Sequence, residues 1–225
     1  MRLPTPPVLL ALLTVLALAL VLGIRLADRA PQDAPTLLLT GFGPFPGFPV
    51  NPSWEVARAL DGTTLDGHVV RAVRLDVAYG RAADQLRAAV RRSRPAIVVN
   101  LGVAAGDAIR LETTARNADR AEAPDVDGVV GGGRPVRATG PATLPSRLPL
   151  AALERDLEAA GFAVRRSDDA GGYLCNHVFY VALDEVAAER PVGFIPVPPT
   201  EGAWTPARLE DAVRAALATI VRETR

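Results

Sequence analysis

The chain has 225 residues, 49% of them hydrophobic, which is enough for one α/β domain with a buried core. Its 25 basic residues, all arginine, balance 25 acidic residues. A net charge of zero argues against a nucleic-acid partner, which needs a basic face. With one cysteine and two histidines, we expect neither an internal disulfide nor a metal site. The sequence has no phosphate-binding or dinucleotide-binding motif, so no cofactor is expected.

Residues 8–24 (VLLALLTVLALALVLGI) form an uncharged apolar run after Arg2. The run is long for the core of a signal peptide and short for a membrane span. An uncleaved membrane anchor is the first expectation, a cleaved signal peptide is the alternative, and a buried helix is the third. We therefore interpret residues 1–26 as a signal anchor or signal peptide, 27–35 as a linker and 36–225 as the domain. The protein is expected to be membrane-anchored, or secreted if the segment is cleaved, and flanking arginines leave its orientation open.

Beyond the linker, hydrophobic spacing predicts strands that alternate with helices. The predicted strands span residues 37–40, 69–77, 96–101, 162–166 and 192–197. The predicted helices begin at Asn51-Pro52 and Thr205-Pro206, which pair an N-cap with proline, and also span 81–92, 150–160 and 175–188. Residues 103–148 are rich in Gly, Pro and Arg and have no simple pattern. The alternation predicts a mostly parallel, twisted sheet covered on both faces, with sites at the carboxyl ends of its strands.

The most informative stretch is Gly171–His177 (GGYLCNH). A Gly-Gly turn leads into a predicted helix with Cys175 in its first turn. Free N–H groups and the helix dipole are expected to lower the pKa of the thiol and to stabilise an oxyanion. The alternative is that Cys175 is a small buried apolar side chain.

Four blocks of the sequence resemble the pyroglutamyl peptidase I (pyrrolidone-carboxylate peptidase) family. They are Thr40–Gly47 with Asn51-Pro52, Glu112–Asn117 continuing to Pro124-Asp125 and Gly128, Gly172–Tyr180, and Gly193–Ile195 followed by Val197-Pro198. Their order and spacing cover the chain from Leu37 to Ile220. The resemblance implies a three-layer α/β/α sandwich, here preceded by the N-terminal hydrophobic helix.

The resemblance also implies a cysteine exopeptidase that removes N-terminal pyroglutamyl residues from peptides. By position, Cys175 is the nucleophile and Glu112 is the carboxylate that orients the catalytic imidazole. Phe42 and Phe45 would line the pocket for the pyrrolidone ring. A homo-oligomer is compatible with the resemblance, because family members often assemble.

The chain departs from the family at the catalytic histidine, because Pro196 occupies that position. General-base assistance contributes about 10²–10⁴-fold to rate, and proline has no group that can supply it. His177 lies about 200° round the helix from Cys175, and His68 lies at the start of a predicted strand, so neither is expected to substitute.

Two further departures point the same way. Val103 stands at the position of a glutamine that helps to hold the pyrrolidone amide, and Glu122 stands at the position of an arginine. Ala123 intervenes before the Pro-Asp pair, and Arg120 is out of register. Two hypotheses follow: a peptidase with an altered mechanism, and a membrane-tethered pseudoenzyme that binds a peptide or protein. The loss of three functional side chains favours strongly reduced or absent activity.

Overall fold

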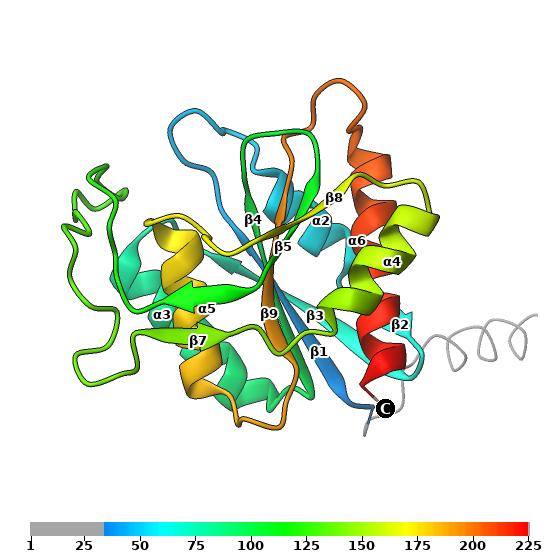
Figure 1. Cartoon of the computed structure of the whole chain (residues 1–225), viewed down its shortest axis with the longest axis horizontal. Coiled ribbons are helices and arrows are strands. Elements are labelled where there is room, and N and C mark those ends of the chain that lie inside the picture. The colour runs from blue at the N-terminus through cyan, green and yellow to red at the C-terminus, as the bar shows by residue number, and fades with distance from the viewer. Residues whose placement is uncertain (1–33, 225) are drawn as a thin grey trace, which may run out of the picture. The chain divides into compact units, whose positions relative to one another are not determined.

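A computed structural model describes residues 34–224 (Figure 1). Strands and helices alternate along most of the chain. The strands are β1 (Thr36–Phe42), β2 (Thr64–Leu65), β3 (His68–Leu75), β4 (Ile97–Val103), β5 (Ile109–Glu112), β6 (Thr114–Arg116), β7 (Thr143–Pro145), β8 (Val164–Ser167) and β9 (Val192–Val197). The helices are α2 (Pro52–Leu60), α3 (Tyr79–Ser93), α4 (Leu150–Ala159), α5 (Leu174–Glu185) and α6 (Pro206–Glu223).

The main sheet has five strands in the order β2-β3-β1-β4-β9. All its pairs are parallel except β2 with β3, so the predicted mostly parallel sheet is confirmed. β5 pairs with β8 in a small parallel sheet and lies against β9, and β6 pairs with β7 in an antiparallel one. The carboxyl ends of β1, β4 and β9 meet at one edge of the main sheet.

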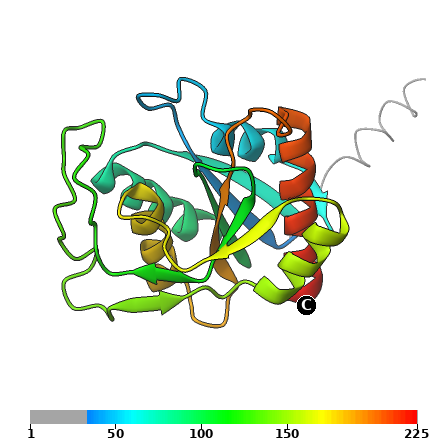
Figure 2. The ribbon, with the colours of Figure 1, turned by 45° about the horizontal axis from the view of Figure 1, so that its top comes forward.

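Alternate residues of the central strands belong to two apolar cores. Leu37 and Leu39 face a core that contains residues of α2, α4 and α6. Leu38 faces a second core, which α3 and α5 complete. The sheet is thus covered by helices on both faces, as the two views of the ribbon show (Figures 1 and 2).

The helix starts that carry a local signal were predicted well. Asn51 caps α2 by accepting a hydrogen bond from the Ser53 N–H at 3.1 Å, and Thr205 caps α6 by accepting one from the Arg208 N–H at 3.2 Å. The start of α3 has no capping side chain next to it in the sequence. Its Tyr79 N–H instead donates to the Asp125 carboxylate at 2.9 Å, across 46 positions of the chain, so α3 begins earlier than periodicity predicts.

The Gly- and Pro-rich stretch 103–148 contains β5, β6 and β7, which the sequence did not reveal. A long loop between β6 and β7 is held by side-chain bonds to the backbone rather than by regular structure. The Asn117 amide, for example, donates to the Arg137 carbonyl at 2.8 Å, and its oxygen accepts from the Arg137 N–H at 2.8 Å.

The apolar segment 8–24 and the predicted N-terminal helix lie outside the described residues, so their assignment stays a prediction. Between residues 34 and 224, no helix has the length and apolar character needed to cross a bilayer.

Replacing Asn51 by alanine tests how the loop after β1 is held. Asn51 is 2% exposed, caps α2 and donates to the Gly43 carbonyl at 3.0 Å. Asn51→Ala is expected to lower the free energy of unfolding by about 1–3 kcal/mol, because it removes the cap and leaves a carbonyl unpaired. The matched control is Thr205→Ala, an exposed cap expected to cost about 0.5–1 kcal/mol. Urea unfolding measures both, and equal losses would contradict the proposed role of Asn51.

Candidate active site

Cys175 lies in the first turn of α5, over the carboxyl end of β4. A Cβ atom built on Gly102 would come within 2.8 Å of the Cys175 sulfur and 2.8 Å of the Phe194 ring. Both distances are too short for a real side chain, and Phe194 is fully buried, so it has little room to move. Glycine at position 102 is therefore what lets the helix bring its thiol down onto the sheet.

Pro196 lies beside this thiol. In the parallel pair of β4 and β9, Pro196 is the register partner of Gly102, the residue that the Cys175 sulfur contacts. Pro196 is buried, and its ring offers neither a proton nor an acceptor nitrogen. The position that the family resemblance assigns to a histidine is thus next to the thiol, but the residue there is chemically inert.

Glu112 ends β5 and is 1% exposed. Within the described part of the chain, neither of its carboxylate oxygens has a hydrogen-bond partner. Burial raises the pKa of this carboxyl, and the Asp169 and Asp168 carboxylates add to the effect. The Ser167 hydroxyl and the Arg110 charge act against the rise in pKa without cancelling it.

Cys175 and Glu112 are close enough to affect each other electrostatically. The Cys175 side chain keeps some solvent exposure, yet protein atoms surround the sulfur, and this burial raises the pKa of the thiol to about 12. The Glu112 carboxylate raises it further, and the backbone N–H of Cys175 only partly opposes both effects. The sequence-based expectation of a lowered thiol pKa is therefore wrong, because burial and a like charge outweigh the helix end.

Neither histidine of the described chain faces Cys175. His177 turns to the α3 side of α5, where its Nδ1 atom lies 3.0 Å from both Asp119 carboxylate oxygens and its ring lies 5.2 Å from the Tyr79 ring. His68 is in β3, on the edge pairing with Leu65 of β2. The prediction that neither substitutes for the missing histidine agrees with this geometry.

The two candidate pocket residues have different environments. Phe42 is 4% exposed and belongs to the apolar cluster against which Cys175 packs. Phe45 is partly buried against the same cluster and stacks on Phe48 with 5.0 Å between ring centroids. Val103 ends β4, where it pairs with Val197.

The loop before α5 is held by contacts that the sequence did not reveal. Arg120 donates to the Asp169 carboxylate at 2.6 Å, so its charge is already paired, and Glu122 is exposed to solvent. The Ala121 N–H donates to the Gly172 carbonyl at 2.8 Å. Asn176, next to the thiol, accepts from the Arg116 N–H at 2.8 Å and donates to the Arg116 carbonyl at 2.9 Å. These bonds tie the start of α5 to β6, the strand that follows Glu112.

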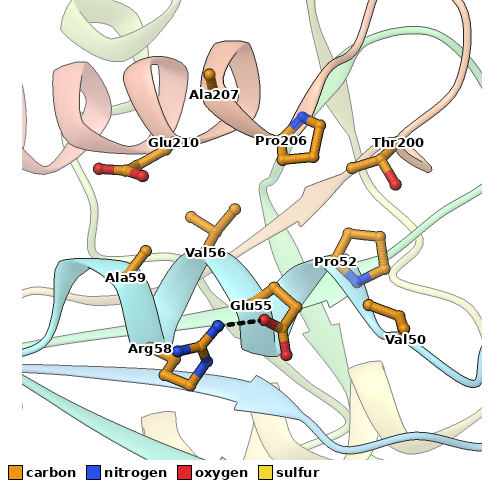
Figure 3. A pocket seen from close by; sticks show the side chains of 10 residues that line it. All are labelled: Val50, Pro52, Glu55, Val56, Arg58, Ala59, Thr200, Pro206, Ala207 and Glu210. Atoms are coloured by element: carbon orange, nitrogen blue, oxygen red, sulfur yellow. Dashed lines mark hydrogen bonds and ion pairs between the residues drawn. The ribbon is translucent and has the colours of Figure 1, made fainter.

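A separate groove of ≈ 400 Å³ lies between α2 and α6 (Figure 3). Its apolar lining includes Val50, Val56 and Pro206. Its carboxylates are paired within their own helices, Glu55 with Arg58 at 2.6 Å and Glu210 with Arg214 at 2.8 Å. Because it contains none of the predicted site residues and both of its carboxylates are paired, this groove is not the candidate active site.

Replacing Gly102 by alanine tests the contact that positions the thiol. The added methyl group must displace Cys175 or Phe194, so Gly102→Ala is expected to lower the free energy of unfolding by about 1–3 kcal/mol. The matched control is Gly80→Ala in α3, where a new Cβ meets nothing within 4 Å and is expected to stabilise by about 0.5–1 kcal/mol. Chemical denaturation compares the two variants. An unchanged stability for Gly102→Ala would mean that Cys175 is not packed against β4.

Comparisons with known proteins identify the family to which this fold belongs. The family described as Pyroglutamyl peptidase matches residues 36–207. The pyrrolidone-carboxylate peptidase of Cupriavidus pinatubonensis is 40% identical over 168 residues, which are 72% of this chain and 78% of that protein. A mutant pyrrolidone carboxyl peptidase from the hyperthermophile Pyrococcus furiosus aligns with a TM-score of 0.81 and 29% identity over 84% of this chain and all of that chain. Pyroglutamyl peptidase I of Bacillus amyloliquefaciens aligns with a TM-score of 0.79 and 28% identity, over 84% and 98% of the two chains. This chain therefore belongs to the pyroglutamyl peptidase family.

Proposed function

We propose that this protein is a pyroglutamyl peptidase homologue whose peptide-hydrolysing activity is strongly reduced or absent, and that it acts by binding peptides. The observation that carries the proposal is the isolation of Cys175 and Glu112 beside Pro196. The pair has no imidazole to connect it, and burial raises the pKa of the Glu112 carboxyl despite the Ser167 hydroxyl and the Arg110 charge.

The first step of thiol-dependent hydrolysis is the attack of a thiolate on the scissile carbonyl. Burial raises the pKa of the Cys175 thiol to about 12, so the protonated thiol predominates near neutral pH. In a complete triad an imidazole accepts the thiol proton, and a carboxylate stabilises the imidazolium that forms. Here Glu112 raises the pKa of Cys175 instead of lowering it, because no cation stands between the two groups.

The second step, departure of the amine, needs a proton donor for the leaving nitrogen. Proline cannot donate a proton, and His177 is committed to Asp119 on the other side of α5. Both the attack and the departure of the leaving group therefore lack assistance. The retained Cys175 and Glu112 support a residual activity as the second candidate, in which the helix end and slow thiolate formation produce weak turnover.

A membrane tether is also part of the proposal. The uncharged run at residues 8–24 supports it, and removal of this segment from the mature protein is the alternative.

The full chain assayed with a fluorogenic pyroglutamyl amide tests the proposal. Wild type is expected to show no turnover above that of Cys175→Ala. Pro196→His is expected to gain activity, because an imidazole at this position would stand next to the thiol; a gain of at least about 10²-fold is in line with general-base assistance. Pro196→Gln is the matched control, since it adds a polar side chain that cannot act as a base near neutral pH.

Turnover by wild type that disappears in Cys175→Ala would contradict the proposal and establish a peptidase that works without the histidine. No turnover by any variant would contradict the expectation for Pro196→His and would mean that one restored side chain is insufficient for catalysis.

A further inference from the structure

Glu112 is a buried carboxyl whose oxygens form neither an ion pair nor a hydrogen bond of normal geometry in the described part of the chain. It is 1% exposed, and neither oxygen accepts a hydrogen bond from the described residues. Leaving a buried carboxyl unpaired costs at least as much as a lost hydrogen bond to a charged group. The site therefore favours any ligand that brings a donor to this carboxylate.

The groups around Glu112 do not supply a strong hydrogen-bond donor or a paired cation for its carboxylate. Arg110, on the same strand, donates to the Ala105 carbonyl at 2.6 Å and affects Glu112 only through its charge. Ser167, on the neighbouring strand, donates its hydroxyl to the Asp169 carbonyl at 3.2 Å, and its influence on Glu112 lowers the pKa of that carboxyl without offsetting burial. On the α5 side, the Cys175 thiol is a weak donor at best.

Two carboxylates lie on the segment that follows β8. Asp168 and Asp169 follow Ser167, the register partner of Glu112, and lead to the turn before α5. The Asp168 side chain is 85% exposed, and its nearest cation, the Arg116 guanidinium, is 3.9 Å away. Asp169 is paired with Arg120. Both carboxylates add negative potential at Glu112.

We propose that the Cys175–Glu112 site binds a primary ammonium group, and that its preferred ligand is therefore a peptide or amine with a free amino group rather than a blocked, neutral N-terminus. A compact ammonium suits a carboxylate that is almost completely enclosed, whereas the larger planar guanidinium group would need more space. The ammonium would donate to the Glu112 carboxylate. This inference rests on the proposed function, because it assigns a ligand to a site that binds instead of hydrolysing.

Cation binding at this site is linked to protons. Where the Glu112 carboxyl is protonated before binding, it must ionise to pair with the ammonium, and one proton is released for each ligand bound. Affinity is therefore expected to rise with pH until Glu112 is ionised in the free protein. Asp168 and Asp169 raise the pH at which this happens, and Arg110 lowers it.

The test is calorimetric titration of the full chain carrying Cys175→Ala, which excludes hydrolysis, with alanyl-alanine amide and with its N-acetyl derivative. The free amine is expected to bind at least about tenfold more tightly than the acetylated peptide between about pH 5 and 7, as expected for a charge-assisted hydrogen bond. Glu112→Gln, which is close in shape, is expected to remove this preference, so that the two peptides bind this variant with similar affinity. Equal affinities for the two peptides, or a preference that survives Glu112→Gln, would overturn the proposal.

Two further measurements complete the test. If Glu112→Gln does not fold, the heat of binding to the Cys175→Ala chain in buffers of different ionisation enthalpy reports the released proton, and binding without pH dependence or proton release overturns the proposal.

Methylamine separates the two sources of ammonium: tighter binding of the dipeptide amide assigns the site to a peptide N-terminus, and equal binding assigns it to a free amine. Because hydrolysis is measured with wild type and binding with Cys175→Ala, failure of either proposal is recognised separately.

Discussion

The parallel pairing of β4 with β9 is the constraint on which the candidate site depends. It fixes Pro196 opposite Gly102, and the absence of a side chain at Gly102 brings the Cys175 sulfur into contact with the sheet. A shift of one residue in this register would turn every side chain of β9 to the other face of the sheet. The backbone hydrogen bonds between β4 and β9 therefore help to position the thiol, the proline and the two apolar cores. Substitution at position 196 is expected to act on the thiol, because Pro196 pairs with the glycine that the sulfur contacts.

A second consequence is electrostatic. A carboxylate and a thiol that share a buried site need a cation between them, because each otherwise disfavours ionisation of the other. Here burial raises the pKa values of both groups, the Asp169 and Asp168 carboxylates add to the rise at Glu112, and Glu112 adds to the rise at Cys175. The unpaired Glu112 carboxylate contributes to the low nucleophilicity of the thiol, and it would also stabilise an ammonium ligand. The end of α5 contributes too little positive potential to reverse this balance, since the helix dipole is equivalent to about half a unit charge.

Several features of the fold could be predicted because their causes are local in the sequence. Two helix starts were predicted from the Asn51-Pro52 and Thr205-Pro206 pairs. Short apolar runs ending in glycine predicted β1 and β4. Other features depend on contacts between distant residues. The start of α3 is capped by Asp125, and the long loop after β6 is organised by Asn117 and Asn176.

At the site, the resemblance to a family identified Cys175, Glu112 and the substituted Pro196 as candidates, and the structure brings these positions together at the end of β4. The raised pKa of the thiol could not be read from the helix-start pattern, because burial and the Glu112 charge arise only in the folded chain. Nor did any sequence signal indicate that Gly102 lies beneath the sulfur. A glycine directly after the apolar run of β4 was visible, but its close contact with α5 is a property of packing.

The measurement that tests the central claim most directly is an NMR titration of the protein labelled with ¹³C at the cysteine Cβ, which gives one resonance because Cys175 is the only cysteine. We expect the wild-type thiol to titrate with a pKa of about 12, well above the ordinary value of 9.0. We also expect Pro196→His to lower the midpoint by about two units or more, because an imidazolium next to the thiolate stabilises its charge. A wild-type midpoint at or below the ordinary value would contradict the isolation of the thiol. The same midpoint in both proteins would show that Pro196 is not what isolates it.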